Sequence, residues 1–521
     1  MADYSHVNVK VQGRSAFDKS FKNILTTKVG AITPLVSKLV IPGSKGSMKI
    51  AISAALPPLA SDTFMRASLR VEAYLCPLRL CYGGFEAWLT GDKIHSSGNL
   101  VSPSIPYLKY TSAQSSYVQP GKLADYLGFQ SAHPEDGMKF NVFPFVAYWR
   151  IIDSWYRNRK IEVPLFYPYD AVTGNTDNPN ALSFLPYQSF SANHAYQFNS
   201  PLPNGSHLGQ LAHRNYDDDY FTTATASAQF GAEQKVTIDS NNQFTISALR
   251  AANSLQQFEE RNNLASPRMV DYVRAVYGAN LANGVAQRPI LLGSARYEVY
   301  SKGISAQSDT TATNNPFTSV GARYGNAFAS GTDFVCNFEA NEPCYLMVMA
   351  TLVPEANYAS GIDHSLRILT DTNSQVDIPN PMLQNIGNEP IFKSEVLDGS
   401  TTPSVFTDGI FGYAQRYLWH KTSRNQVHGL LRAGESLASF VAQRLFTVDA
   451  EISGLFLKIG ETDLDNVTAV TSDLSQYGCW IDSFIDLKVS EPLAESSLPS
   501  LQDPAYEHGH DVSLKINGDN F

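Results

Sequence analysis

Charged residues are scarce in this chain of 521 residues. Asp, Glu, Lys and Arg together make up 17% of the sequence, well below the roughly 25% of an ordinary soluble domain. Aromatic residues reach 11%, and protein interfaces shift composition in the same direction, away from charge and toward aromatics. The formal net charge of -10 excludes a strongly basic, histone-like binder.

Cysteine is also rare, and targeting segments are missing. The five cysteines form no C-x-x-C pair, which predicts buried free thiols in a reducing compartment and argues against a disulfide or zinc framework. The first residues lack the basic and then apolar layout of a signal peptide. The densest apolar run, 344–353, is too short to span a bilayer. We therefore expect neither export nor membrane insertion.

Common catalytic motifs are absent as well. The sequence contains no G-x-S-x-G, H-E-x-x-H, G-x-G-x-x-G or G-x-x-x-x-G-K-[ST], so the signatures of many hydrolases, zinc proteases and nucleotide-binding proteins are missing. This weakens the case for an enzyme. The consecutive carboxylates of Asp217, Asp218 and Asp219 could contact calcium, although a polar loop is the more common meaning of such a run. No other cofactor is indicated.

Apolar periodicity predicts a mainly β fold. Apolar and polar residues alternate at 47–56 and 68–75, as in half-buried strands. Further strand-like runs lie at 235–238, 344–353, 426–431, 455–459 and 483–489. Helical spacing predicts a few helices, over 145–157, 247–262 and 266–278. Short strands separated by long connections favour an antiparallel β-sandwich or jelly roll.

Positive charge gathers at the N-terminus. Residues 1–50 contain eight Lys and Arg against two Asp, a net charge of +6, which leaves -16 for the remainder. A basic arm on an acidic body suits contact with a polyanion, and a solvated terminal segment that binds nothing is the alternative. The candidate phosphate contacts are Lys10, Arg14, Lys19, Lys22 and Lys28.

A second group of cations follows the predicted helix over 145–157. Aromatic side chains precede Arg157, Arg159 and Lys160, and aromatics interleaved with cations can stack on and neutralise single-stranded nucleic acid. The alternative is a core-facing helix with a basic C-terminal end, which suits the helix dipole.

Several blocks, taken in order along the chain, carry a family resemblance. They are GRSAFDKSF at 13–21, YLCPLRL at 74–80, KLADYLG at 122–128, FPFVAY at 143–148, WYRN at 155–158, DYFTT at 219–223, ALR at 248–250, LQQFEER at 255–261, QRP at 287–289, LG at 292–293, FGYAQRY at 411–417 and VHGLLR at 427–432. Together they resemble the major capsid protein of microviruses, small icosahedral bacteriophages with circular single-stranded DNA, particularly the gokushovirus-like branch.

The resemblance implies a viral jelly roll with long inserted loops. It divides the chain into a basic, interior arm at 1–45 and a single jelly-roll domain at 46–521, with variable loops at about 160–245 and 300–332. It further implies a T=1 icosahedral shell of about sixty copies, found in the virion and assembled in the bacterial cytoplasm. In relatives a long insertion that forms threefold protrusions follows the DYFTT block, whereas only 232–243 fills that place here, so such protrusions are not implied.

The implied partners are other copies of the chain, the single-stranded DNA genome, other virion proteins such as a spike, pilot or small DNA-binding protein, and a host cell-surface receptor. Two rival functions remain open from the residues alone. One is a β-sandwich glycan-processing enzyme, which would need a pair of carboxylates about 5 to 10 Å apart. The other is a receptor-binding, lectin-like spike subunit.

Overall fold

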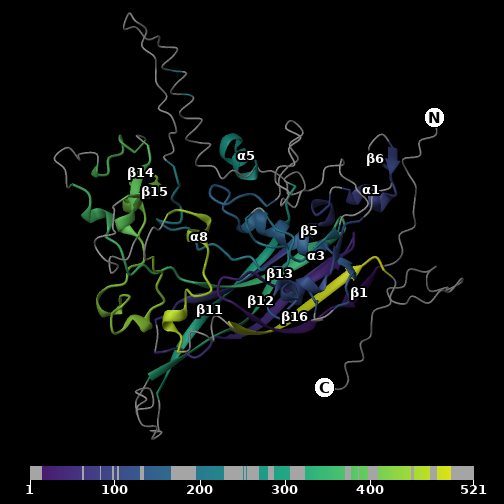
Figure 1. The fold of residues 1–521 in the computed structure, drawn as a ribbon, viewed down its shortest axis with the longest axis horizontal. Helices are drawn as coiled ribbons and strands as arrows, with labels where there is room; N and C mark the ends of the chain where they lie inside the picture. Colours follow the sequence, from purple (N-terminus) through teal and green to yellow (C-terminus); the bar gives the residue numbers. More distant parts are fainter. Residues whose placement is uncertain are drawn as a thin grey trace, which may run out of the picture.

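Eight long strands form the body of the protein in a computed structural model (Figure 1). The structure describes residues 14–493 apart from 62–63, 83, 97–98, 102–104, 130–133, 166–194, 203, 228–249, 251–253, 255–268, 280–286, 306–322, 370–376, 385–386, 397–408, 447–450 and 470–477. The long strands are β2 (Phe21–Thr27), β3 (Thr33–Val40), β4 (Lys45–Ala55), β5 (Ala67–Pro77), β11 (Ile290–Ser305), β12 (Arg323–Glu339), β13 (Cys344–Pro354) and β16 (Cys479–Glu491).

The pairing of these strands is that of a jelly roll. β2, β16, β4 and β12 form one antiparallel sheet, and β3, β13, β5 and β11 form the other. The two sheets join where β11 leaves β5 after Val299 and pairs with β12 from Tyr300 onward. The short β1 (Ser15–Asp18) adds to the end of β16. Two four-stranded sheets built in this way confirm the predicted jelly-roll sandwich.

The apolar pattern of each strand matches its place in the sandwich. β4 and β16 alternate because one face of each points into the core, where Met48, Ile50, Ile485 and Leu487 are at most 1% exposed. Every residue of β13 is buried, because its second face is covered as well, and this explains its continuous apolar run. The strands predicted at 47–56, 68–75, 344–353 and 483–489 are therefore confirmed.

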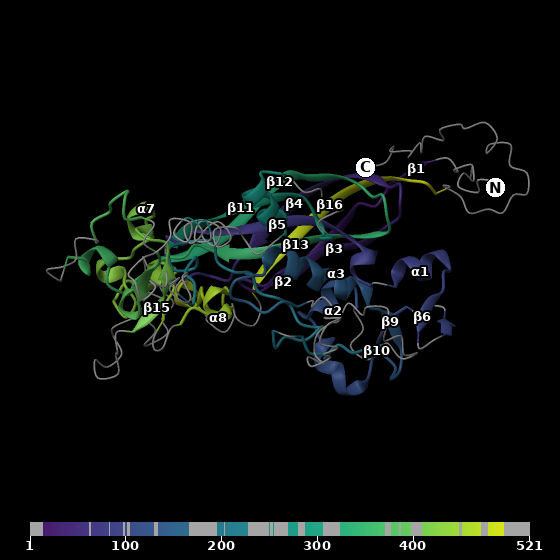
Figure 2. The ribbon, with the colours of Figure 1, turned by 90° about the horizontal axis from the view of Figure 1, so that it is seen from above.

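Two long insertions interrupt the jelly roll. The first, 78–289, contains α3 (Phe143–Ile151), which continues as a π-helical turn over Ile152–Tyr156 and packs on the outer face of the β3-β13-β5-β11 sheet. α3 confirms the helix predicted at 145–157. The second, 355–478, lies at one end of the long axis, where Figure 2 shows β15, α7 and α8, while α1 and β6 lie at the other end. No helix among the described residues has the length and apolar character to cross a membrane.

The remaining elements are short. In the first insertion they are α1 (Phe85–Thr90), β6 (Ile94–Ser96), β7 (Asn99–Val101), β8 (Tyr107–Lys109), α2 (Leu123–Tyr126), β9 (Lys139–Asn141), β10 (Ala195–Tyr196) and α5 (Met269–Tyr277). In the second they are β14 (Glu389–Phe392), β15 (Ile410–Ala414), α7 (Leu418–Lys421) and α8 (Gly454–Leu457). Turns of 3-10 helix lie at Leu78–Leu80, Ser112–Tyr117, His364–Leu366, Lys393–Glu395, Gly429–Leu431, Ala438–Phe440 and Asp465–Val467.

α5 confirms the helix predicted at 266–278 over its described residues, and Gly278 follows it at a φ of 67°. The helix predicted at 247–262 lies almost entirely outside the described residues, and so does the strand at 235–238. The strands predicted at 426–431 and 455–459 are wrong. Gly429 begins a 3-10 turn at a φ of 67°, and the hydroxyl of Ser453 caps α8 by accepting the N–H of Phe456 at 3.3 Å.

The predicted segment boundaries also need correction. β1, β2 and β3 precede residue 45 and belong to the sandwich, where Phe21 and Leu25 pack against the core, so the described part of the predicted arm at 1–45 is not separate from the domain. The loop predicted at 300–332 is narrower, because β11 extends to Ser305 and β12 begins at Arg323. Within 160–245, the described residues 195–227 are packed, with Phe198 and Phe221 fully buried.

The structure explains why residue 293, in the LG block at 292–293, is a glycine. Gly293 lies at a β-bulge where β11 shifts register against β5. A Cβ atom at this position would clash with the carbonyl oxygen of Val335 in β12. Only glycine allows the backbones of β11 and β12 to approach this closely.

Candidate functional site

The outer face of the β2-β16-β4-β12 sheet is exposed in the described part of the chain and carries aromatic side chains. We call it the open face (Figure 2). The strand register places Trp480 and Phe328 on either side of Ala55, and Phe484 beside Ala51. These rings and that of Phe334 are 45% to 52% exposed. The exposed side chains that define the open face are Lys22, Ile24, Lys49, Phe328, Phe334, Trp480, Asp482 and Phe484.

The opposite outer face of the sandwich is covered. On β13, Tyr345, Met347 and Met349 point away from the core between the sheets and are buried beneath α3 and its neighbours. A groove of about 960 Å³ lies at the end of the sandwich beside β1, and its lining includes Phe17 and the inward-pointing Phe338 as well as Lys45 and Lys488. The sandwich therefore offers one exposed aromatic surface rather than two.

Most predicted cations near the N-terminus are held by partners within the chain. The guanidinium of Arg14 donates to the carbonyl oxygens of Gly43 at 2.5 Å and Ser490 at 3.0 Å. Lys19 pairs with Glu491 at 2.6 Å, Lys22 with Asp482 at 2.9 Å and Lys28 with Glu461 at 2.7 Å. Lys22, on the open face, is in a half-exposed pair, and such pairs are worth only about 0 to 1 kcal/mol. Lys10 lies outside the described residues.

The second predicted group lies in the first insertion, away from the open face. Arg157 forms an ion pair with Asp153 at 2.7 Å, and both side chains are less than 10% exposed. Its guanidinium also donates to the carbonyl oxygen of Glu162 at 2.9 Å. Arg157, Arg159 and Lys160 line a pocket of about 490 Å³ together with Asp217 and Asp218. The structure thus brings the predicted basic and acidic groups together.

The three consecutive aspartates have different surroundings. The hydrogen bond from Arg70 lowers the pKa of Asp217, and the two residues form an ion pair at 2.5 Å. Burial raises the pKa of Asp218, and its two charged neighbours raise it further. Asp219 accepts the N–H groups of Phe221 at 2.9 Å and Thr222 at 2.8 Å. No group of three or more potential metal ligands converges among the described residues, so a calcium site gains no support from this geometry.

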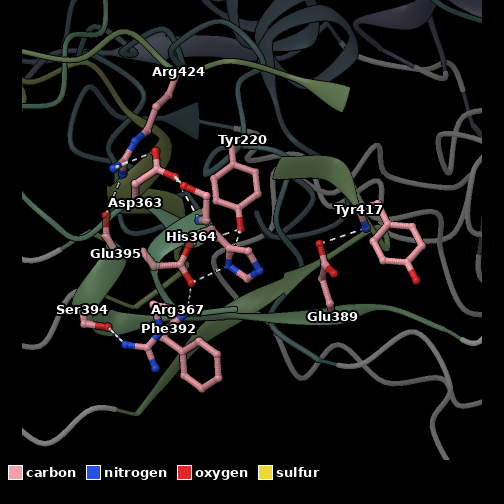
Figure 3. Close-up of polar contacts among 11 residues, drawn as sticks. Tyr220, Asp363, His364, Arg367, Glu389, Phe392, Ser394, Glu395, Tyr417 and Arg424 are labelled. Carbon is pink, nitrogen blue, oxygen red and sulfur yellow. Dashed lines mark hydrogen bonds and ion pairs between the residues drawn. The ribbon is translucent and has the colours of Figure 1, made fainter. Parts of the chain in front are cut away.

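A buried polar cluster ties the second insertion together (Figure 3). His364 Nδ1 lies 3.0 Å from Glu395 Oε1, and the two side chains are 11% and 1% exposed. The hydroxyl of Tyr220, from the first insertion, donates to Glu395 Oε2 at 3.2 Å. Nearby, Asp363 lies 3.7 Å from Arg424 and accepts a hydrogen bond from Gln426 at 2.8 Å. These contacts hold together segments that are far apart in the sequence.

The cluster shifts the pKa of two of its members upward. Burial lowers the pKa of His364, but the hydrogen bond and negative charge of Glu395 outweigh it, so the net pKa is raised. For Glu389, burial raises the pKa. The hydrogen bond that its carboxylate accepts from the N–H of Tyr417 at 2.9 Å lowers the pKa, but by less than burial raises it. Both groups therefore favour their protonated forms in the folded protein.

Comparison with known proteins identifies the family. The chain matches the family model described as "Capsid protein (F protein)" over residues 5–501. The chain belongs to this capsid protein family. The capsid protein is 22% identical to capsid protein VP1 of Chlamydia phage 1, in an alignment that covers 96% of this chain and 97% of the relative. It is 21% identical to that of Spiroplasma virus 4, covering 94% and 95%. For Bdellovibrio phage phiMH2K the identity is 20%, covering 88% and 90%.

These findings confirm the microvirus resemblance and the prediction of a major capsid protein. The family consists of structural capsid proteins, which confirms that the chain is not an enzyme, and the capsid protein is a component of the virion. The glycan-processing and lectin-like alternatives receive no support. The aromatic side chains of the open face were not among the predicted site residues. Their signal is readable, because Trp480 and Phe484 occupy outward positions of an alternating strand.

The polar cluster predicts that the second insertion of the capsid protein loosens as the pH rises. A raised pKa means that the folded state binds the proton more tightly. The contribution of His364 is therefore complete below its ordinary pKa of about 6.5 and is lost as the pH rises through the higher folded value. Hydrogen exchange of the amides between 358 and 393, corrected for the intrinsic rate, should show less protection at pH 8.5 than at pH 6.

His364→Gln should remove most of this pH dependence above pH 6.5. It should also lower the protection at pH 6, because it takes the positive charge away from buried Glu395. The matched control is His420→Gln, since the side chain of His420 is exposed. Equal pH dependence in the parent and in His364→Gln would show that another group controls the stability of this region.

Proposed function

We propose that about sixty copies of this capsid protein close an icosahedral shell around the circular single-stranded DNA of a phage, with the open face turned toward the genome. The observation that carries the proposal is the exposed row of aromatic rings on the open face, separated by small side chains. Rings presented in this way can stack on nucleotide bases without reading their sequence, at about 1 to 3 kcal/mol for each base.

One outer face of the sandwich is covered by an insertion and the other is not, and this difference supports turning the open face toward the genome. The first insertion covers the outer face of the other sheet, and long connections of this kind usually carry the variable, outward contacts of a protein. The open face has no such cover in the described part of the chain. Its lysines can approach phosphates, since Lys22 is in an exposed pair and Lys49 forms no ion pair among the described residues.

The predicted cations then divide into two roles. Arg14, Lys19, Lys28 and Arg157 act within the fold, because each is bound by carboxylates or carbonyl oxygens of its own chain. Lys22, with Lys49 beside the aromatic rings, is the better candidate for a phosphate contact. DNA contact would be nonspecific, through phosphates and stacked bases.

The relatives are capsid proteins of phages, and on that basis the proposal extends to a wider setting. It includes assembly in the bacterial cytoplasm, other virion proteins and a host cell-surface receptor. The cysteines agree with a reducing compartment, since all five are free and buried.

Removing the rings of the open face should weaken DNA binding and leave assembly intact. For the double variant Trp480→Ser with Phe484→Ser, we expect the affinity for a labelled thymidine oligonucleotide to fall by about tenfold or more, because two stacking platforms are lost. Fluorescence anisotropy measures the affinity, and negative-stain microscopy should still show closed shells. The salt dependence of binding should not change, because no cation has been removed.

Tyr277→Ser is the control, because Tyr277 is 71% exposed on α5, which lies apart from β12 and β16 in Figure 1. Shells of the double variant that bind the oligonucleotide as tightly as the parent would show that the open face does not meet the genome. A parent chain that stays monomeric at high concentration would contradict the shell itself.

A further inference from the structure

An apolar groove lies at the end of the molecule that carries α1. It has a volume of about 640 Å³, and its lining includes Leu39, Phe85, Trp88, Ile105 and Phe140. Leu39, Trp88 and the neighbouring Leu89 are 51%, 42% and 54% exposed. Among the described residues that line the groove, only Lys139 is charged. An exposed aromatic and aliphatic surface of this kind is typical of the centre of a protein interface.

Exposed apolar side chains also gather at the start of the second insertion. We call them the apolar ridge: Ile362, Leu366, Leu369, Ile378 and Met382, which are 47%, 74%, 57%, 55% and 89% exposed. The carboxylate of Asp377 accepts the N–H of Leu369 at 3.2 Å, which joins the two halves of the ridge. Its charge is opposite to that of Lys139 in the groove.

The buried polar cluster fixes the ridge on the body of the insertion. Ile362 donates its N–H to the carbonyl oxygen of Ser394 at 2.8 Å, and the next two residues are the Asp363 and His364 of the cluster. Arg367 hydrogen-bonds to Ser394 and lies over the ring of Phe392. The side chains of His364 and Arg367 therefore point toward the polar cluster (Figure 3), whereas Leu366 is exposed. A rigid, preorganised ridge costs little entropy when it binds.

The groove and the ridge lie at opposite ends of the long axis. Figure 1 shows α1 at one end and β14 and β15, to which the ridge is tied, at the other, and Figure 2 shows α1 and β15 at the same opposite ends. A contact between two such surfaces joins copies head to tail and leaves one groove and one ridge free for the next copy. Contacts of this kind produce closed rings when the rotation between copies fits.

We infer that the apolar groove of one capsid protein receives the apolar ridge of a neighbouring copy. The inference rests on the proposed shell, since a shell brings copies of the chain together. We take a second copy of the chain as the occupant of the groove. Each copy carries the exposed apolar ridge, and the carboxylate of Asp377 on that ridge can pair with Lys139 in the groove. None of the described residues that line the groove is acidic, so the lining would not select a basic partner.

Paired cysteines test the contact directly, because all five native cysteines are buried and give little background. Chains with both Leu89→Cys and Met382→Cys, or both Leu89→Cys and Leu366→Cys, are assembled and treated with a mild disulfide-forming oxidant. Non-reducing electrophoresis should show a ladder of linked chains for at least one of the two pairs. The single variants are the controls, and none should form the ladder, because a head-to-tail contact does not bring equivalent residues together.

The outcomes separate this inference from the proposed function. Closed shells in which neither pair forms a ladder would overturn the groove-and-ridge contact and leave the shell in place. Shells in which Leu89→Cys alone links pairs of chains would also overturn it, because that result requires a twofold contact between two grooves. A parent chain that forms no shell would contradict the proposed function instead.

Discussion

Replacing Gly293 with alanine should leave little folded capsid protein. The new Cβ atom would clash with the carbonyl oxygen of Val335, a backbone atom in the middle of β12. Neither strand can move away, because β11 is paired with β5 and β12 with β4. We expect the free energy of unfolding to fall by about 4 kcal/mol or more, a large part of the roughly 5 to 15 kcal/mol that stabilises a typical protein. The yield of soluble chain and its urea midpoint measure the effect.

Gly454→Ala is the matched control. The nearest atom to a Cβ at this position is the side-chain Cγ of Glu162 at 3.3 Å, which needs to shift by only a few tenths of an ångström, whereas the contact at Gly293 is with a backbone atom. This variant should unfold at nearly the parent urea concentration. A normal midpoint for Gly293→Ala would show that the two strands are further apart than the bulge at Gly293 implies.

Local sequence patterns predict the strands whose surroundings are uniform along their length. β4 and β16 alternate because one face lies in the core and the other on the open face, and β13 is continuously apolar because both faces are buried. The wrong strands, at 426–431 and 455–459, are apolar runs without a partner strand. Their correct structure depends on the left-handed backbone of Gly429 and on the cap from Ser453. For α8, the sequence does contain a readable signal, which is the capping residue Ser453 directly before Gly454 and the apolar residues of the helix.

The pairing of distant segments cannot be read from such patterns. The basic residues near the N-terminus look like an arm, because the sequence does not show that β2 lies beside β16, the last strand of the sandwich. That pairing places Lys22 next to Asp482, and the end of β16 brings Glu491 to Lys19. For the same reason the open face as a whole is not apparent from the sequence. Alternation shows that Trp480 and Phe484 point to one side of their strand, but it does not show that β12 brings Phe328 and Phe334 onto the same face.

Arg444 joins the two insertions through an unusual environment for a buried cation. It is 6% exposed, and its partners are aromatic rings, a hydroxyl and a carbonyl oxygen, with no carboxylate in an ion pair with it among the described residues. Its guanidinium carbon lies 4.2 Å from the ring centre of Tyr216 and 4.4 Å from that of Phe456. It donates to the hydroxyl of Tyr358 at 3.0 Å and to the carbonyl oxygen of Phe456. Burial raises the pKa of both tyrosines, so they stay protonated.

Negative charge reaches Arg444 indirectly. The hydroxyl of Tyr358 donates to Asp219 at 2.6 Å, and that of Tyr216 donates to Asp463 at 2.7 Å. Each tyrosine therefore places a ring or an oxygen against the cation and donates a hydrogen bond to a carboxylate. Asp219, which the sequence suggested as a calcium contact, thus belongs to the network that neutralises this buried charge.

Arg444→Met should destabilise the capsid protein by about 3 kcal/mol or more, because it removes a buried charge with its hydrogen bonds and leaves the Phe456 carbonyl oxygen without its donor. Arg444→Lys keeps the charge but not the planar group that stacks on the rings, so an intermediate loss is expected. Arg66→Met is the control at an exposed arginine and should stay within about 0.5 kcal/mol of the parent. Urea unfolding of dissociated subunits gives these values. If Arg444→Met were as stable as Arg66→Met, the rings alone would hold the insertions together and the cation would be dispensable.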